Sequence, residues 1–369
     1  MKPLAGVRVV ELARILAGPW CGQLLADLGA EVVKIERPGT GDDTRHWGPP
    51  FLFDAAGTNR DAAYFHAANR GKRSVAIDIA TPEGQAAVRA LVADADVVIE
   101  NYKVGGLARY GLDHAALSAV RPGLVTCSIT GFGQTGPYAH RAGYDFVIQA
   151  MGGAMSLTGE PDGAPQKSGV AYADLFTGVY SAVAILAALR RRDVTGEGAH
   201  IDMALLDTQV AVLGNQALNW MASGIVPTRM GNGHANLVPY QAFETVDGAL
   251  VVAVGNDAQF ARLCAVLGLD LSANPRFATN PARVANRAAL IAALQGAIAT
   301  WRKAALYEAL EAAAIPAGPI NALNEVFADP QVMARGMAIT REGLPGLAGP
   351  IVIDGERMVA DGPSPARTG

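Results

Sequence analysis

The stretch "VRVVELARILAGPWCGQLLADLGAEVVKIE", residues 7–36, decides the fold class. It opens on a β-branched apolar run at 7–12, continues through a helix-like segment at 20–30 that ends near Gly29, and closes on a second apolar run at 31–36. A strand, a helix and a strand in succession are typical of a βαβ unit, whose two strands lie parallel.

The same alternation continues through the first half of the chain. Further strands are predicted at 73–79, 96–102 and 124–132. A helix is predicted over 81–95, because Thr81 is a favourable N-cap residue and Pro82 suits the first helical position. The pattern predicts an α/β fold: a Rossmann-like, mostly parallel sheet with helices on both faces, forming a large domain.

The usual dinucleotide signature is missing. The segment after the first strand, "ARILAGPW" at 13–20, has no G-x-G-x-x-G turn, and the glycines of 131–136 open no convincing helix. NAD binding therefore has little support.

A second, smaller α+β domain is predicted after a composition change near residue 224. Residues 223–239 are rich in Gly, Pro and Asn, and 240–255 predict a hairpin that turns at Asp247-Gly248. Three helix-like segments follow. The expected organisation is a large domain over 1–205 completed by 337–369, a small domain over 225–320, and linkers at 206–224 and 321–336.

Composition narrows the classes of function. The 369 residues are 50% hydrophobic and 17% charged, and the mean hydropathy of +0.20 predicts large buried helices or an extensive subunit interface. The net charge of −4 argues against a nucleic-acid partner. The three cysteines are widely spaced and form no metal or disulfide pattern, which favours the reducing cytoplasm and predicts no metal. The apolar run 175–189 ends at three arginines and is too short for a membrane span.

One acid stands at the head of an almost wholly apolar stretch. In "SGVAYADLFTGVYSAVAILAAL", residues 168–189, Asp174 precedes a long helix-like run. Asp174 could be the helix N-cap, accepting a backbone N–H. It could also be a site of chemistry, which is compatible with capping: partial desolvation makes a carboxylate more reactive, and one that is ionised at pH 7 needs no adjacent base.

The whole chain resembles the class III CoA-transferases, the family of formyl-CoA transferase and the carnitine-CoA transferases, in a superfamily that includes the α-methylacyl-CoA racemases. The resemblance rests on the order and spacing of several motifs. They are residues 3–38, "KRSVAIDI" at 72–79, "DVVIENY" at 96–102, "GLDHAAL" at 111–117, "GFGQTGPYAHRAGYD" at 131–145, "YADLFTG" at 172–178 and "TGEGAHIDMALLD" at 195–207.

The resemblance implies that Asp174 is the catalytic nucleophile, which forms an aspartyl anhydride and then an aspartyl–CoA thioester. It implies an acyl-CoA donor, a carboxylic acid acceptor and an interlocked homodimer. Coenzyme A then enters as part of the substrates, and no tightly bound cofactor is expected.

The resemblance also implies a set of CoA-binding residues. Arg37 and Arg109 match CoA contacts, Asn101 and Tyr102 match residues lining the nucleotide and pantetheine, and Ala17 matches a backbone contact. Lys72 and Arg73 are taken as surface or structural residues. Arg14 and Leu16 replace more polar residues of formyl-CoA transferase, which argues against a formyl/oxalate substrate pair.

Tyr144 and Asp145 are expected near the acyl substrate. A racemase of this superfamily has a His before the Asp to act as a base, whereas a tyrosine with a pKa of about 10 is a poor base. The transferase reading is therefore preferred, with a racemase acting at the α-carbon as the alternative and a non-catalytic CoA-binding protein as a further rival.

The acceptor acid is expected to meet a glycine-rich loop. Gly231 and Gly233 suit a lid, and His234 and Asn236 could reach the acceptor carboxylate, although a plain domain linker has the same composition. The polar loop favours small dicarboxylates, with succinyl-CoA as donor.

Overall fold

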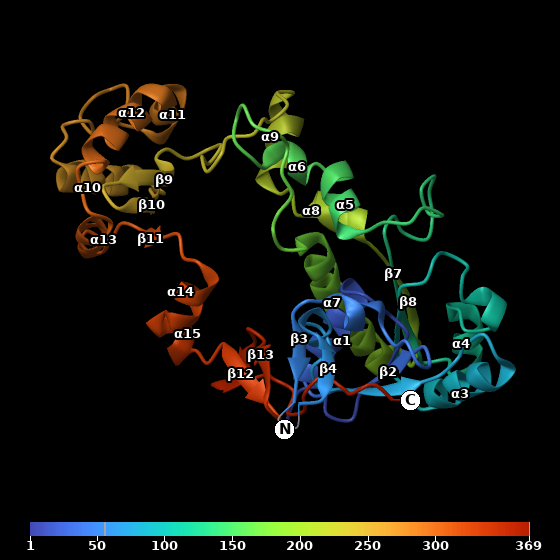
Figure 1. The fold of residues 1–369 in the computed structure, drawn as a ribbon. Helices are drawn as coiled ribbons and strands as arrows, with labels where there is room; N and C mark the ends of the chain where they lie inside the picture. Colours follow the sequence, from blue (N-terminus) through green and yellow to red (C-terminus); the bar gives the residue numbers. More distant parts are fainter. Residues whose placement is uncertain (55–56, 369) are drawn as a thin grey trace. The chain divides into compact units, whose positions relative to one another are not determined.

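The computed structural model describes residues 1–54 and 57–368, which divide into two compact units (Figure 1). The first unit comprises Met1–Ala154, Lys167–Gly214 and Asp329–Gly369, and the second comprises Met155–Gln166 and Asn215–Ala328. Each unit has its own hydrophobic core.

The first unit is built on a six-stranded sheet in which every neighbouring pair is parallel. Its strands are β1 (Arg8–Glu11), β2 (Glu31–Glu36), β5 (Lys72–Ala76), β6 (Val97–Glu100), β7 (Val125–Thr130) and β8 (Ala199–Ala204). Their order is β5-β2-β1-β6-β7-β8, the strand order of the Rossmann fold. The predicted fold class is therefore confirmed. The strand β8 was not expected from the sequence.

Helices cover both faces of this sheet. They are α1 (Ala17–Asp27), α3 (Pro82–Ala93), α4 (His114–Val120) and α7 (Tyr172–Thr195). Successive strand residues point to opposite faces: Val9 belongs to the core cluster shared with α1 and α7, whereas Val10 belongs to the cluster shared with α3 and α4. Each face therefore carries an apolar cluster, as is typical of a parallel sheet buried on both sides.

The start of α3 follows the sequence prediction. The Thr81 side chain accepts a hydrogen bond from the N–H of Gly84 at 3.0 Å, and Pro82 is the first helical residue. The other elements of the first unit are η1 (Asp43–His46), β3 (Phe51–Phe53), β4 (Asn59–Ala62), α2 (Ala63–His66), η2 (Ala108–Tyr110), α5 (Asp145–Met151), α8 (Leu205–Ala211), α15 (Pro330–Ala334), β12 (Ala338–Arg341), β13 (Leu344–Leu347), β14 (Val352–Ile353) and β15 (Glu356–Arg357). The short α6 (Ala154–Leu157) begins where the chain leaves the first unit.

The second unit combines a small antiparallel sheet with helices. Its elements are α9 (Asn215–Ser223), β9 (Tyr240–Thr245), β10 (Gly248–Ala253), α10 (Asp257–Leu267), α11 (Asn280–Ala285), α12 (Arg287–Ile298), α13 (Lys303–Ala312), β11 (Ala317–Pro319) and α14 (Leu323–Ala328). The strand order is β11-β10-β9. The predicted hairpin is present as β9 and β10, and the chain turns between Thr245 and Gly248.

The division into units departs from the expected boundaries in three places. Residues 155–166 group with the second unit although they precede α7 in the chain. The expected linker 206–224 is largely helical, in α8 and α9, and the expected linker 321–336 contains α14 and α15. Apolar residues at helical spacing in these two segments indicate helices, and the prediction of linkers did not take them into account.

The C-terminal segment packs on the first unit. The N–H of Ala360 donates to Asp27 Oδ1 at 2.8 Å, and the N–H of Gly71 donates to the carbonyl of Pro363 at 3.0 Å. Long-range contacts of this kind close the edge of the sheet near β5.

The helix α7 is long and apolar enough to cross a membrane by length and composition alone. In its most apolar window 44% of the residues are buried. Core helices of soluble proteins meet the same criterion, and α7 belongs to the core cluster that covers the sheet.

Candidate active site

The carboxyl ends of β1 and β6 form the topological switch point of the sheet. The chain continues from β1 toward β2 on one side and from β6 toward β7 on the other. Ligands of open α/β sheets bind in the crevice outside this point. Three of the expected CoA-binding residues lie there: Ala17 is the first residue of α1, and Asn101 and Tyr102 follow β6 directly.

The two loops at this point are fixed to each other. The Asn101 side chain accepts the N–H of Arg14 at 2.9 Å and donates to the carbonyl of Arg14 at 2.6 Å. The N–H of Tyr102 donates to Glu100 Oε2 at 2.7 Å, and burial raises the pKa of the Glu100 carboxyl. The backbone on both sides of the crevice is thus held before any ligand binds.

Arginines and tyrosines surround the crevice. The Arg14 guanidinium lies 6.0 Å from the centroid of the Tyr102 ring, and that of Arg109 lies 4.5 Å from the ring of Tyr110. Burial raises the pKa of Tyr102, and the charges of Arg14 and Arg37 act against that rise. Positive charge beside flat aromatic surfaces suits a ligand that carries phosphates and a purine.

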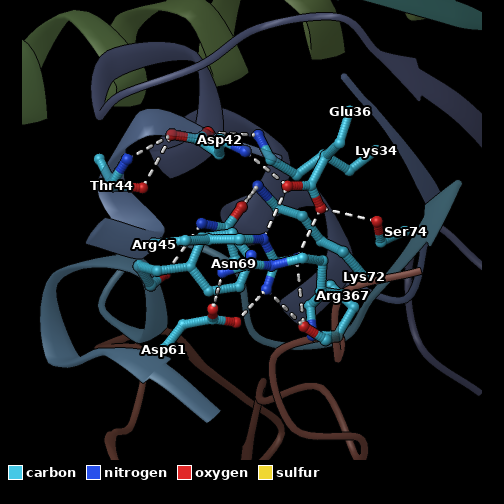
Figure 2. Close-up of polar contacts among 12 residues, drawn as sticks. Lys34, Glu36, Asp42, Thr44, Arg45, Asp61, Asn69, Lys72, Ser74 and Arg367 are labelled. Carbon is cyan, nitrogen blue, oxygen red and sulfur yellow. Dashed lines mark hydrogen bonds and ion pairs between the residues drawn. The ribbon is translucent and has the colours of Figure 1, made fainter. Parts of the chain in front are cut away.

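A buried ionic network supports the loop between β1 and α1 (Figure 2). Lys34 Nζ lies 3.0 Å from Glu11 Oε1 and 2.9 Å from Asp42 Oδ2, and it donates to the carbonyl of Ala13 at 2.7 Å. Lys72 Nζ donates to Glu11 Oε1 at 2.9 Å and to the carbonyl of Pro19 at 2.8 Å. Burial lowers the pKa of Lys72 to about 8. Lys72 is therefore structural and not a surface residue.

A second part of the network fixes the segment that follows β2. Arg45 Nη2 lies 2.6 Å from Glu36 Oε1, and its Nη1 lies 2.5 Å from Asp61 Oδ2. Asp61 also pairs with Arg367 of the C-terminal segment at 2.6 Å (Figure 2). The Arg45 guanidinium stacks on the ring of Phe65 at 3.7 Å. This arrangement holds η1 and α2 in place.

The structure shows where Asp174 lies at the start of α7. The N-cap of α7 is Ala171, no side chain caps the helix from that position, and Asp174 is the third helical residue. The N-cap interpretation of Asp174 is therefore wrong. Asp145 takes that role from α5, because its Oδ1 accepts the N–H of Ala173 at 2.9 Å and that of Asp174 at 3.3 Å.

The Asp174 carboxyl is half-buried and poorly solvated. Burial raises its pKa to about 7, and the negative charge of Asp145 contributes to the rise. This shift opposes the ionisation at pH 7 that is expected from the sequence. Strongly shifted carboxyl groups cluster at functional sites, so Asp174 is the candidate reactive group of this region.

Sequence reasoning missed Tyr64, which lies within electrostatic range of this acid pair, and its neighbour Trp47. Burial raises the pKa of Tyr64, and the charges of Asp174 and Asp145 add to that effect, which places the Tyr64 ring in their electrostatic range. Tyr64 packs edge-on against Trp47 with centroids 5.2 Å apart. No motif marks either residue, because both lie in the irregular connection between β2 and β5.

Tyr144 and Asp145 differ in their surroundings. Tyr144 is the N-cap residue of α5, and its side chain is 62% exposed. Asp145 is the first residue of α5, and its Oδ2 accepts a hydrogen bond from Gln149 Nε2 at 2.7 Å. Both Asp145 oxygens are thus engaged, so its contact with substrate stays a prediction.

The remaining expected residues, His234 and Asn236, belong to the second unit. Asn236 Oδ1 accepts hydrogen bonds from Asn215 at 3.2 Å and Asn219 at 2.9 Å. The carbonyl of His234 accepts one from Arg287 at 2.8 Å. The loop is thus anchored to α9 and α12, and its role as a lid stays a prediction.

Comparison with known proteins identifies the family. The sequence profile described as "CoA-transferase family III" matches residues 4–366. The chain belongs to CoA-transferase family III. A succinate–glutarate CoA-transferase of Agrobacterium fabrum is 56% identical over 369 residues, which cover 98% of this chain and 92% of the relative. The human succinyl-CoA:glutarate CoA-transferase is 44% identical over 343 residues, covering 93% of this chain and 77% of the relative.

Solved structures agree with this assignment. The crystal structure of a CaiB/BaiF family protein from Brucella suis is 58% identical and superimposes with a TM-score of 0.88, covering 99% of this chain and 96% of that chain. The transferase therefore acts on CoA thioesters. Within residues 1–54 and 57–368 it has no group of three or more His, Cys, Asp or Glu side chains that could hold a metal ion.

Proposed function

We propose that this transferase moves CoA from succinyl-CoA to a small dicarboxylate such as glutarate, through covalent intermediates on Asp174. The observation that carries the proposal is the Asp174 carboxyl itself. It is half-buried at the start of α7, its pKa is raised to about 7, and no lysine or arginine is ion-paired with it among the described residues.

The chemistry needs only this carboxylate and the substrates. An Asp174 oxygen attacks the thioester carbonyl of succinyl-CoA, the C–S bond breaks, and CoA thiolate leaves with the electron pair. The thiolate then attacks the aspartyl carbonyl of the mixed anhydride and releases succinate. The acceptor carboxylate attacks the resulting aspartyl–CoA thioester, and the returning thiolate takes the acceptor acyl group and frees Asp174. No proton has to move in any step.

Asp145 is a positioning residue in this scheme. Its carboxylate binds two N–H groups of the first turn of α7, which fixes the backbone of Asp174. Its negative charge also opposes the ionisation of Asp174, and a carboxylate of higher pKa is a stronger nucleophile once ionised. Tyr64 feels the charges of both acids and packs against Trp47, so its ring is the aromatic group we expect nearest to them.

The choice of acids is supported by the relatives. Those from Agrobacterium fabrum, mouse and human are named for succinate or succinyl-CoA and glutarate. A relative from Chloroflexus aurantiacus, at 37% identity, is named for succinyl-CoA and D-citramalate. Succinate or succinyl-CoA recurs in these names, while the second acid varies.

A panel of carboxylic acids tests the proposal. Purified transferase is given succinyl-CoA with glutarate, mesaconate, oxalate, acetate or a branched fatty acid, and new thioesters are identified by mass. We expect glutaryl-CoA to form fastest. Transfer to monocarboxylates alone would contradict the dicarboxylate assignment. Deuterium exchange at the α-carbon of an acyl-CoA, without any acceptor, would instead indicate the racemase reaction.

We also propose that the active form is an interlocked homodimer in the cytoplasm. Large apolar side chains on α5 and α7 are exposed in the single chain, among them Phe146 at 55%, Phe176 at 45%, Tyr180 at 45% and Val183 at 57%. A soluble monomer rarely leaves so many apolar groups uncovered on one pair of helices. A second copy is the covering surface that the family resemblance predicts.

A further inference from the structure

One arginine at the switch point is unexplained by the proposed function. Arg14 follows β1, and nothing in the expected site residues gives it a role. Its side chain is 39% exposed and pairs with Asp43, which is 47% exposed, at 2.7 Å. Surface ion pairs of this kind contribute little to stability.

The backbone of Arg14, in contrast, is held unusually firmly. The Asn101 side chain binds both its N–H and its carbonyl. The next residue, Ile15, has a φ of 73°, a left-handed conformation that a β-branched residue adopts only under strain. The N–H of Ile15 donates to Asp42 Oδ1 at 3.3 Å, so the buried network helps to maintain this strained turn.

A rigid backbone that presents an exposed, weakly paired guanidinium is the arrangement of a binding residue. The Arg14 guanidinium lies 6.0 Å from the centroid of the Tyr102 ring, beside the switch point of the sheet. The adjacent helix α1 begins at Ala17, three residues after Arg14, and no side chain caps it.

We infer that Arg14 binds a phosphate group of the CoA moiety and that the Asp43 carboxylate occupies its guanidinium only until CoA binds. The inference rests on the proposed function, because it takes CoA thioesters as the substrates. Phosphate offers the guanidinium two parallel charge-assisted hydrogen bonds, a stronger partner than the half-exposed Asp43 carboxylate. Binding then exchanges one anion for another, and Arg14 need not move far.

The inference predicts opposite results for the two members of the ion pair. Arg14→Ala removes the phosphate ligand, so the affinity for free CoA should fall about tenfold to a hundredfold, the range for hydrogen bonds to charged groups. Asp43→Asn removes only the competing carboxylate, so CoA should bind as well as in the wild type or up to a few-fold tighter. If the pair were merely structural, both variants would weaken binding alike.

Titration calorimetry of the full chain with CoA measures these effects. Arg8→Ala is the matched control, since Arg8 begins the same strand, is 56% exposed and faces two acids at 3.8 Å. Arg14→Met keeps most of the apolar stem, and thermal unfolding checks each variant. The difference in CoA affinity between wild type and Arg14→Ala should become smaller as the salt concentration increases. A parallel titration with 3′-dephospho-CoA locates the contact. If Arg14 binds the 3′-phosphate, wild type and Arg14→Ala should bind this compound equally well. If Arg14 binds the pyrophosphate, Arg14→Ala should still bind it more weakly.

The results that overturn the inference are distinct from a failure of the proposed function. Equal CoA affinity in Arg14→Ala, Arg14→Met and Arg8→Ala overturns it, as does equal weakening by Arg14→Ala and Asp43→Asn. In both cases wild type still binds CoA and transfers it from succinyl-CoA. A wild-type chain that binds no CoA would contradict the proposed function instead.

Discussion

Replacing Asp174, the proposed nucleophile, should stabilise the protein, and the effect should depend on pH. Asp174→Asn keeps the shape of the side chain and resembles the protonated acid. Because Asp174 caps no helix, the change removes no capping hydrogen bond. It removes a carboxylate whose ionisation the folded state opposes.

The magnitude follows from the pKa of Asp174. Folding raises it from 3.8 to about 7. Between these values the folded state binds more protons than the unfolded chain, so this group makes the free energy of unfolding fall as pH rises from about 4 to about 7. At about 1.4 kcal/mol per pKa unit, the limit is about 4 kcal/mol above pH 7. Partial solvent access lowers the expected gain of Asp174→Asn to about 1–4 kcal/mol at pH 8, with almost none at pH 4.

Urea unfolding at several pH values, at one protein concentration, measures this gain. Asp207→Asn is the matched control, because Asp207 is the third residue of α8 and is exposed. Its unfolding should differ from that of wild type by less than about 0.5 kcal/mol at every pH. The reasoning would be refuted if Asp174→Asn did not increase the free energy of unfolding at pH 8, or if it increased it equally at pH 4.

Further predictions concern catalysis, CoA binding and assembly. The kcat/KM for succinyl-CoA should fall about tenfold per pH unit below about 7, because only ionised Asp174 attacks, and a flat pH profile would contradict this. Arg109→Ala should raise the KM for the CoA donor by an amount equivalent to about 1–3 kcal/mol and change kcat less. An unchanged KM would indicate that Arg109 is a surface charge that does not bind CoA. Light scattering at micromolar concentration should show a dimer, and a monodisperse active monomer would contradict the interlocked assembly.

Much of the first unit follows from local sequence patterns. The strands β1, β2, β6 and β7 are apolar runs of β-branched residues, and α3 carries its own start signal in Thr81 and Pro82. The strand β8 was missed, because alternate residues in it are polar or charged, such as His200 and Asp202. An edge strand need not be apolar on both faces, so its pattern resembles that of a loop.

The candidate site was predictable only in part. The motif "YADLFTG" pointed to Asp174, but nothing local indicated that Asp145, 29 residues earlier, would hold the start of α7. The same limit applies to Lys34 and Glu11, charged residues in strands that read as surface groups until the fold buries them together. Pairings over long sequence separations depend on topology, which residue patterns do not contain.

The most direct test of the account is chemical trapping of the covalent intermediate. Wild-type transferase is incubated with succinyl-CoA and then with hydroxylamine, digested, and analysed by peptide mass spectrometry, with Asp174→Asn treated in parallel. The account predicts that the hydroxamate forms on Asp174 alone, that it requires the CoA thioester, and that the Asn variant is stable, unlabelled and inactive. Transfer of CoA without modification of Asp174, labelling at Asp145 instead, or an active Asn variant shown not to have deamidated would contradict it.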